Sequence, residues 1–224
     1  MRRWLFEQSL TVFFLAIFLL ALVGQSFVGL LAYNDEQRSH DGHAISYARY
    51  LVSSDFAGNV MENWQSEFLQ FSLIVLATVW LVQRGSPESK PLQDAGPESD
   101  EQAQVGDHAP RGAPRWARLD DWRLRLYENS LVLAMLLVFL GSWFAQSLTN
   151  WRMFNDEQAQ HGEAAVSWPT YVVEPDFWNR TLQNWQSEFL AVATMTAFSI
   201  YFRQRGSPES KPVGAPHDET GSSG

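Results

Sequence analysis

The stretch Leu10–Ala32, LTVFFLAIFLLALVGQSFVGLLA, decides the fold. Its 23 residues include no charged side chain, and only Thr11, Gln25 and Ser26 are polar. A helix of about 20 apolar residues crosses the roughly 30 Å hydrocarbon core of a bilayer. The stretch therefore predicts a membrane-spanning helix, although the mean hydropathy of the whole chain is only −0.21.

The same pattern occurs a second time. Residues 5–90 align without a gap with residues 126–211, and 35 of the 86 pairs are identical. Each copy has a long apolar run, Leu10–Ala32 or Leu131–Leu148, and a shorter one, Phe68–Val82 or Phe189–Phe202. A shorter run spans a bilayer only if the preceding Trp-Gln-Ser-Glu continues its helix. The pattern predicts an all-α integral membrane protein with four transmembrane helices, arranged as two parallel-repeat helical hairpins.

A cleaved signal peptide is the alternative for the first run, because Arg2 and Arg3 precede it. The run is longer than the apolar part of a signal peptide, and its twin lies in the middle of the chain. Both observations favour a retained helix.

Four segments follow from this organisation. Residues 1–90 and 122–212 are the two membrane repeats, each with an outer loop, about residues 33–53 and 154–174. Residues 91–121 are expected to be a disordered cytoplasmic linker, because Pro, Gly, Gln, Asp and Glu dominate them. Residues 213–224 are expected to be a disordered tail.

Turn and capping residues predict where the second helix of each repeat begins and ends. It should begin near Ser54 and near Pro175, where Asp or Pro suits a first turn. It should end at Arg-Gly-Ser-Pro, residues 84–87 and 205–208, because Gly permits a left-handed cap and Pro prevents continuation.

Basic residues predict the orientation of the chain. With both termini in the cytoplasm, twelve Lys and Arg residues lie on that side and four lie opposite, the bias typical of cytoplasmic loops. The net charge of −9 does not oppose this, since acidic residues contribute little to orientation.

Polar side chains within the predicted spans are the candidate functional residues. By helix rise, Gln25, Ser26 and Glu67 fall at similar heights, and Gln146, Ser147 and Glu188 repeat them. The six residues are interpreted first as an interhelical hydrogen-bond clamp. The alternative is a small cation or proton pathway that uses Glu67 and Glu188, since intramembrane ionisable groups often mark such routes.

Trp64, Trp185, Arg84 and Arg205 are predicted interface anchors, because Trp and Arg gather at membrane boundaries. His40 and His161 follow acidic residues in the outer loops and are candidate metal ligands. Their spacing matches no established metal motif, which favours solvated loop residues.

Other chemistry receives no support. The chain has no cysteine, phosphate-binding glycine loop, nucleophile elbow or two-histidine zinc helix. Its basic residues are scattered and its soluble segments are acidic, which argues against nucleic-acid binding. No enzyme activity and no cofactor are expected.

The repeated blocks Asn-Asp-Glu-Gln, Asn-Trp-Gln-Ser-Glu-Phe-Leu and Gln-Arg-Gly-Ser-Pro-Glu-Ser-Lys-Pro resemble those of a family of small bacterial integral membrane proteins of unknown function. The resemblance covers residues 5–90 and 126–211, and it implies residence in the bacterial inner membrane. We therefore expect a non-enzymatic structural or interaction protein, with the lipid bilayer and a second copy or another membrane protein as partners.

Overall fold

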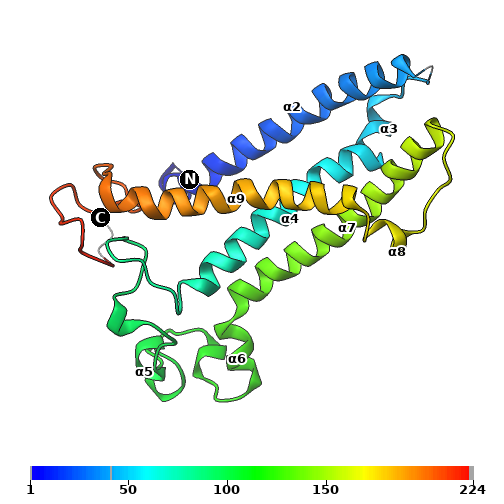
Figure 1. Ribbon diagram of the computed structural model, residues 1–224. Helices are drawn as coiled ribbons and strands as arrows, with labels where there is room; N and C mark the ends of the chain where they lie inside the picture. Colours follow the sequence, from blue (N-terminus) through cyan, green and yellow to red (C-terminus); the bar gives the residue numbers. More distant parts are fainter. Residues whose placement is uncertain (1, 41, 222–224) are drawn as a thin grey trace. The chain divides into compact units, whose positions relative to one another are not determined.

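The computed structural model describes residues 2–40 and 42–221 (Figure 1). Within these ranges the chain forms α-helices, short 3-10 helices and turns, and no β-strand. The all-α prediction is confirmed for this part of the chain. Residue 41 of the first outer loop and residues 222–224 of the predicted tail lie outside it.

The first copy contains α1 (Arg2–Glu7), α2 (Ser9–Ser39), α3 (Tyr47–Leu51) and α4 (Ser54–Ala77). The predicted start of its second long helix at Ser54 is confirmed. Ser53 precedes α4, and its Oγ accepts a hydrogen bond from the Phe56 N–H at 3.2 Å, which satisfies one free donor of the first turn.

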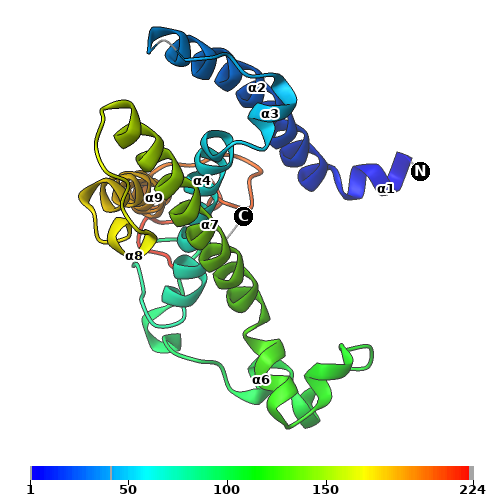
Figure 2. The same ribbon diagram turned by 90° about the vertical axis from the view of Figure 1, so that its right-hand side faces the viewer.

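The second copy contains α6 (Trp122–Glu128), α7 (Ser130–Gln160), α8 (Trp168–Tyr171) and α9 (Pro175–Tyr201). Both copies thus have a short helix, a long helix, a short helix and a second long helix in the same order. The predicted start of the second long helix at Pro175 is confirmed. In both views, α7 leads through α8 into α9 (Figures 1 and 2).

Both long helices extend beyond their apolar runs. The Asn-Asp-Glu-Gln blocks at 34–37 and 155–158 lie in the last turns of α2 and α7, although the sequence placed them in the outer loops. Arg38 in the last turn of α2 adds a favourable charge at the negative end of that helix. Each helix therefore continues through charged residues beyond its apolar run.

The second helices end earlier than predicted, at Ala77 and Tyr201 rather than at Arg84 and Arg205. At the end of α9, the Arg203 guanidinium donates to the Ser199 and Ile200 carbonyl oxygens at 3.3 and 3.0 Å. This side chain satisfies carbonyl groups that the end of a helix leaves without partners. The Arg-Gly-Ser-Pro segments instead form separate turns.

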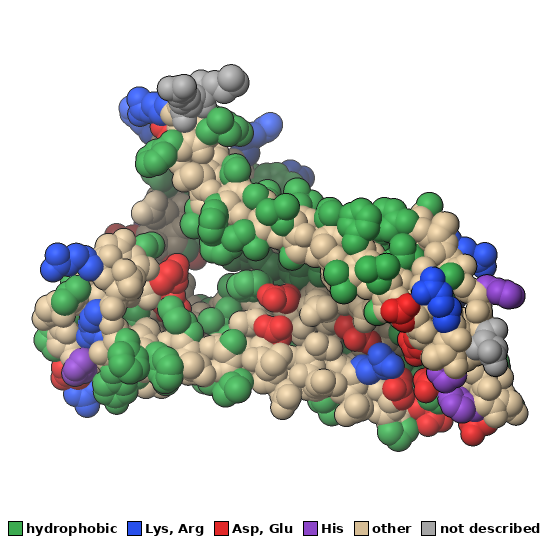
Figure 3. Space-filling view, turned by 90° about the horizontal axis from the view of Figure 1, so that it is seen from above, with side chains coloured by type: hydrophobic (Ala, Val, Ile, Leu, Met, Phe, Trp, Pro, Cys, Tyr) green, Lys and Arg blue, Asp and Glu red, His purple; other side chains and the backbone are tan. Residues whose placement is uncertain are grey.

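Two helices, α2 and α7, are long and apolar enough to span a membrane. Hydrophobic side chains are exposed along α2 (Figure 3), whereas the central helix of a soluble protein would bury them. The apolar parts of α4 and α9 are shorter than those of α2 and α7, because Glu62 and Glu67 interrupt α4 and Arg180 and Glu188 interrupt α9.

The chain divides into two compact units. The first contains Met1–Met61 and Ala145–Phe177, and the second contains Glu62–Phe144 and Trp178–Gly224. The first unit thus includes α2, α3, α8 and the start of α4. In the second unit, Trp143 of α7 packs against Trp178 and Trp185 of α9, with ring centroids 6.0 and 6.1 Å apart.

Between the repeats, the second unit contains short elements: η1 (Leu92–Asp94), α5 (Asp100–Ala103), η2 (Gly106–His108) and η3 (Arg115–Arg118). The described part of the tail contacts the Arg-Gly-Ser-Pro turn at residues 84–87, since Arg84 pairs with Asp218 at 3.2 Å and the Gly85 N–H donates to Thr220 Oγ1 at 2.9 Å. The disorder expected for the linker and the tail stays a prediction.

Candidate functional site

An asparagine closes each outer loop. Asn34 Nδ2 donates to the Ile45 carbonyl at 3.1 Å, and the Ile45 N–H donates back to Asn34 Oδ1 at 2.8 Å. Asn155 and Val166 form the same pair at 3.0 and 2.8 Å. A side-chain amide can replace a backbone partner in this way, since it carries both a donor and an acceptor. The identity of the Asn-Asp-Glu-Gln blocks thus has a structural basis.

A buried tyrosine connects each loop to the following helix. Tyr50 OH donates to Asp55 Oδ1 at 3.1 Å, and Tyr171 OH donates to Asp176 Oδ2 at 2.9 Å. The two rings are 1% and 0% exposed. Burial and the neighbouring Asp55 carboxylate raise the pKa of Tyr50, which keeps its hydroxyl protonated as a donor.

A third contact joins each long helix to its loop. Ser26 Oγ lies 2.8 Å from Tyr47 OH, and Trp168 Nε1 donates to Ser147 Oγ at 3.1 Å. The sequence assigned both serines to the polar layer. In the structure they bind aromatic side chains of their own loops (Figure 2 shows α3 beside α2).

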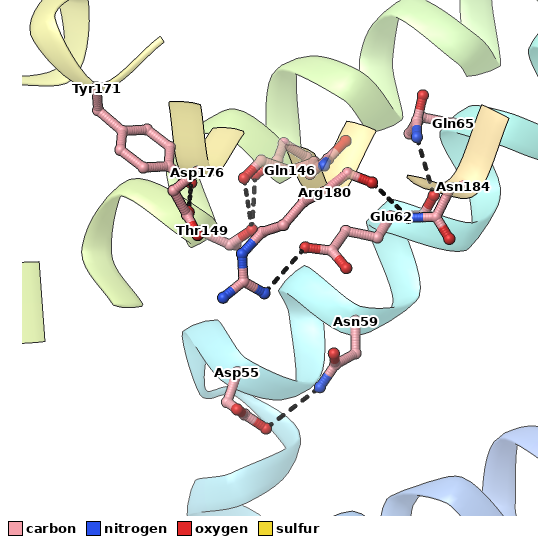
Figure 4. A network of polar contacts seen from close by, with 11 residues as sticks. Asp55, Asn59, Glu62, Gln65, Gln146, Thr149, Tyr171, Asp176, Arg180 and Asn184 are labelled. Carbon is pink, nitrogen blue, oxygen red and sulfur yellow. Dashed lines mark hydrogen bonds and ion pairs between the residues drawn. The ribbon is translucent and has the colours of Figure 1, made fainter. Parts of the chain in front are cut away.

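Polar contacts connect α4 and α9 inside the second unit. Arg180 Nη1 lies 3.6 Å from Glu62 Oε1, and both side chains are largely covered (Figure 4). Trp185 Nε1 donates to Gln65 Oε1 at 2.7 Å, and Gln65 is fully buried. The predicted anchor Trp185 therefore holds two helices together, while Trp64 stays partly exposed.

The six residues of the predicted polar layer differ in their surroundings. Gln25 is exposed and Gln146 is fully buried, and the Gln146 amide makes no hydrogen bond to any described residue. Glu67 is exposed and Glu188 is half-buried, and the two carboxylates are close enough to repel each other. The glutamines and serines belong to the first unit and the glutamates to the second. A single layer of all six stays a prediction.

The other sequence candidates lie at the surface. Arg84 pairs with Asp218, and Arg205 is exposed. His161 Nδ1 lies 2.9 Å from the Glu157 carbonyl oxygen, and His40 follows the last residue of α2. Among residues 2–40 and 42–221, no three His, Asp or Glu side chains gather where they could hold a metal ion.

The two Arg-Gly-Ser-Pro-Glu-Ser-Lys segments fold alike. The Gln83 N–H donates to Ser89 Oγ at 2.8 Å, and the Gln204 N–H donates to Ser210 Oγ at 2.9 Å. The glycine of each turn adopts a φ of 87° or 82°, which side chains with a Cβ rarely reach. Here again the identical residues hold a turn.

This fold brings the two Arg-Gly-Ser-Pro-Glu-Ser-Lys turns together at one carboxyl pair. The carboxyl groups of Glu88 and Glu209 lie within hydrogen-bonding reach of each other. The hydrogen bond to Glu209, partial burial and the Glu209 charge raise the pKa of Glu88 to about 7. Two carboxyl groups that lie within hydrogen-bonding reach of each other can share a proton or bind a cation.

Sequence reasoning did not single out Asn34, Tyr50, Asp55 or Glu88 as functional residues. The available signal was the identity of each with its counterpart in the second copy, outside the apolar runs. Identity between the copies could not show which of these residues closes a loop and which shares a proton, because the partner of each residue is not adjacent in the sequence.

A family model described as "Domain of unknown function (DUF6766)" matches residues 1–222. No curated protein and no solved structure matches the chain.

Proposed function

Because the chain belongs to the family described as a domain of unknown function (DUF6766), whose description assigns no activity, we propose a function from the architecture. The protein is a non-enzymatic, multi-pass protein of the bacterial inner membrane. Its four helices α2, α4, α7 and α9 span the bilayer with both termini in the cytoplasm. Its two outer loops present a fixed surface to a second copy or to another membrane protein.

Helix length supports four spans. α4 and α9 contain 24 and 27 residues, about 36 and 40 Å at 1.5 Å per residue, which exceeds a core of about 30 Å. Glu62 and Arg180, which lie in the first halves of these helices, are then placed toward the outer boundary. There the Glu62–Arg180 pair offsets part of the cost of burying its members.

The observation that carries the interaction role is the repeated set of hydrogen bonds in the outer loops. Three contacts occur in each copy: Asn with a loop backbone, Tyr with Asp, and Ser with an aromatic side chain. Preorganised loops lose less conformational entropy when they bind a partner. These polar groups hold the loops, and for this reason we propose binding rather than catalysis.

Single cysteines test the topology, because the chain has none of its own. His43→Cys, Gln93→Cys and Ala164→Cys each place one thiol at an exposed position. A membrane-impermeant maleimide added to intact cells should label positions 43 and 164, and position 93 only after permeabilisation. If only α2 and α7 crossed, positions 43 and 93 would react and position 164 would not. That second pattern would overturn four spans.

The same thiols test the interaction role. A short crosslinker with a maleimide at one end and a photoreactive diazirine at the other, attached to the thiol of the His43→Cys variant and irradiated, should give a discrete product, at twice the chain mass for a second copy or at another fixed mass for a different protein. The Gln93→Cys variant is the matched control on the opposite side. If position 43 is labelled but yields no discrete product, the outer loops do not bind a partner.

A second candidate, the small cation or proton pathway, is favoured by one observation. The carboxylates of Glu67 and Glu188 are close enough to repel each other, as two groups on one route would be. Glu67→Gln with Glu188→Gln should then abolish ion flux into liposomes while the fold is retained. Unchanged flux with lowered thermal stability would instead support the clamp.

A further inference from the structure

A cavity of about 490 Å³ lies between α4 and α9 in the second unit. Its walls include Leu73 and Ile74 of α4 and Phe189 and Val192 of α9. The volume is in the range of small-molecule sites. Apolar walls of this kind accept a hydrocarbon chain and exclude a freely soluble ion.

The cavity runs along the two helices over a limited height. Its α4 wall extends from Gln70 to Ala77 and its α9 wall from Phe189 to Thr196. Seven residues rise about 10 Å, which is less than the roughly 15 Å of one leaflet. In the proposed topology, on which this step rests, the apolar part lies within the inner leaflet. The remaining wall, from Gln83 to Ser89, lies at headgroup depth.

The inner end of the cavity is acidic. Glu88 lines it, and the Glu88 carboxyl is hydrogen-bonded to Glu209. Both residues are exposed and therefore accessible to a headgroup. The hydrogen bond to Glu209 is the largest cause that raises the pKa of Glu88 to about 7, followed by partial burial and then by the Glu209 charge.

Three basic residues of the two turns have partners other than this pair. Arg84 pairs with Asp218 at 3.2 Å, and Lys90 pairs with Glu98 at 3.3 Å. Lys211 Nζ donates to three carbonyl oxygens of residues 216–219 at 2.9–3.1 Å. The other charged groups of the two turns and the tail are Arg203, which binds carbonyl oxygens, Arg205 and Glu219.

The wall also includes a hydroxyl group at its inner end. Ser86 lines the cavity, and the residue is 3% exposed. A serine hydroxyl carries one donor and two acceptor lone pairs, so it can accept a hydrogen bond from a ligand N–H at this end of the cavity.

We propose that this cavity binds a phospholipid of the inner leaflet whose headgroup carries a primary ammonium. An acyl chain occupies the apolar part, and the ammonium donates to the Glu88 and Glu209 carboxylates. Charge complementarity selects this headgroup over an anionic one, since the acidic pair repels an anion. A primary ammonium also has three N–H donors for two carboxylates and the Ser86 hydroxyl, whereas a quaternary ammonium has none.

Binding should depend on pH. Below about pH 7 the shared proton occupies the carboxyl pair, and an ammonium must compete with it. Above that pH the pair carries two charges and attracts the ammonium more strongly. Affinity should therefore rise from pH 6 to pH 8.

The test uses the purified full-length chain in detergent and native mass spectrometry. Phosphatidylethanolamine, phosphatidylcholine and phosphatidylglycerol are titrated at pH 6 and pH 8, with free ethanolamine as a soluble amine. Phosphatidylethanolamine should bind about tenfold more tightly than the other two lipids at pH 8, the ratio expected from one charge-assisted contact. Equal binding of the three lipids, or equal binding of free ethanolamine, overturns the proposal.

Variants separate the two halves of the site. Glu88→Gln with Glu209→Gln should remove the preference among headgroups and the pH dependence, and Glu101→Gln is the matched control on the exposed helix α5. Ala77→Phe should fill the apolar part and weaken binding of every lipid. If the double variant keeps the preference, the proposal fails.

Cysteine labelling decides the topology separately, so headgroup selectivity without four spans would refute the proposed function and retain the site.

Discussion

The asparagine that closes each outer loop, Asn34 or Asn155, can be tested by a local measurement in each copy. Asn34→Ala removes both hydrogen bonds to Ile45, of 3.1 and 2.8 Å. At about 0.5–1.5 kcal/mol for each bond, the loop should lose about 1–3 kcal/mol of local stability. A change of 1.4 kcal/mol is a factor of ten, so the Ile45 amide should exchange its hydrogen about 5 to 150 times faster.

The second copy supplies the control. Asn155→Ala removes the equivalent bonds to Val166, but the Val166 carbonyl also accepts a hydrogen bond from Trp151 Nε1 at 2.7 Å. The first copy has Leu30 at the position of Trp151 and lacks this donor. The acceleration at Val166 should therefore lie in the lower half of the range.

Hydrogen exchange with peptide-level mass spectrometry, on protein in detergent micelles, measures both loops in one sample. Each variant should accelerate exchange only in its own loop. If the exchange rate of the Ile45 amide were unchanged in the Asn34→Ala variant, the hydrogen bonds of Asn34 would not hold this loop. An equal change in both loops would show that the substitution acts globally.

Three further substitutions test other contacts. Tyr50→Phe removes a hydrogen bond to a carboxylate and should lower the free energy of unfolding by about 1.5–3 kcal/mol in denaturant titrations, whereas an unchanged midpoint would contradict the contact. Trp185→Phe leaves the buried Gln65 acceptor without its donor and should cost about 1–3 kcal/mol by the same measurement; a variant as stable as the wild type would refute the role of this bond. Between pH 4.5 and about pH 7, Glu88 keeps its proton in the folded chain but loses it in the unfolded chain. Thermal stability should therefore fall as the pH rises through this window, and the Glu88→Gln variant should show a smaller fall. A slope equal to that of the wild type would show that other groups cause it.

The apolar runs and the capping residues could be predicted because both are local signals. Composition alone marked α2 and α7, and Ser54 and Pro175 marked the starts of α4 and α9. The end of α2 could not be predicted in this way. Asn34 favours loops in isolation, but in the structure it continues the helix, since its side chain binds the returning backbone of Ile45.

The candidate site depended more on tertiary structure. The repeat paired Gln25 with Gln146, yet one is exposed and the other fully buried, because burial depends on neighbours that the repeat does not share. The Glu88–Glu209 pair joins residues 121 positions apart in the chain, and no local pattern indicates such a contact. Periodicity and spacing describe a single element, so they cannot supply these partners.

The ion pair between Glu62 and Arg180 makes the two copies non-interchangeable. The position equivalent to Arg180 in the first copy is Asn59, and the position equivalent to Glu62 in the second is Gln183. A symmetric dimer of either half alone would therefore lack one member of this pair. The two copies are therefore complementary at this position: each supplies one charge of the pair, and neither copy carries both.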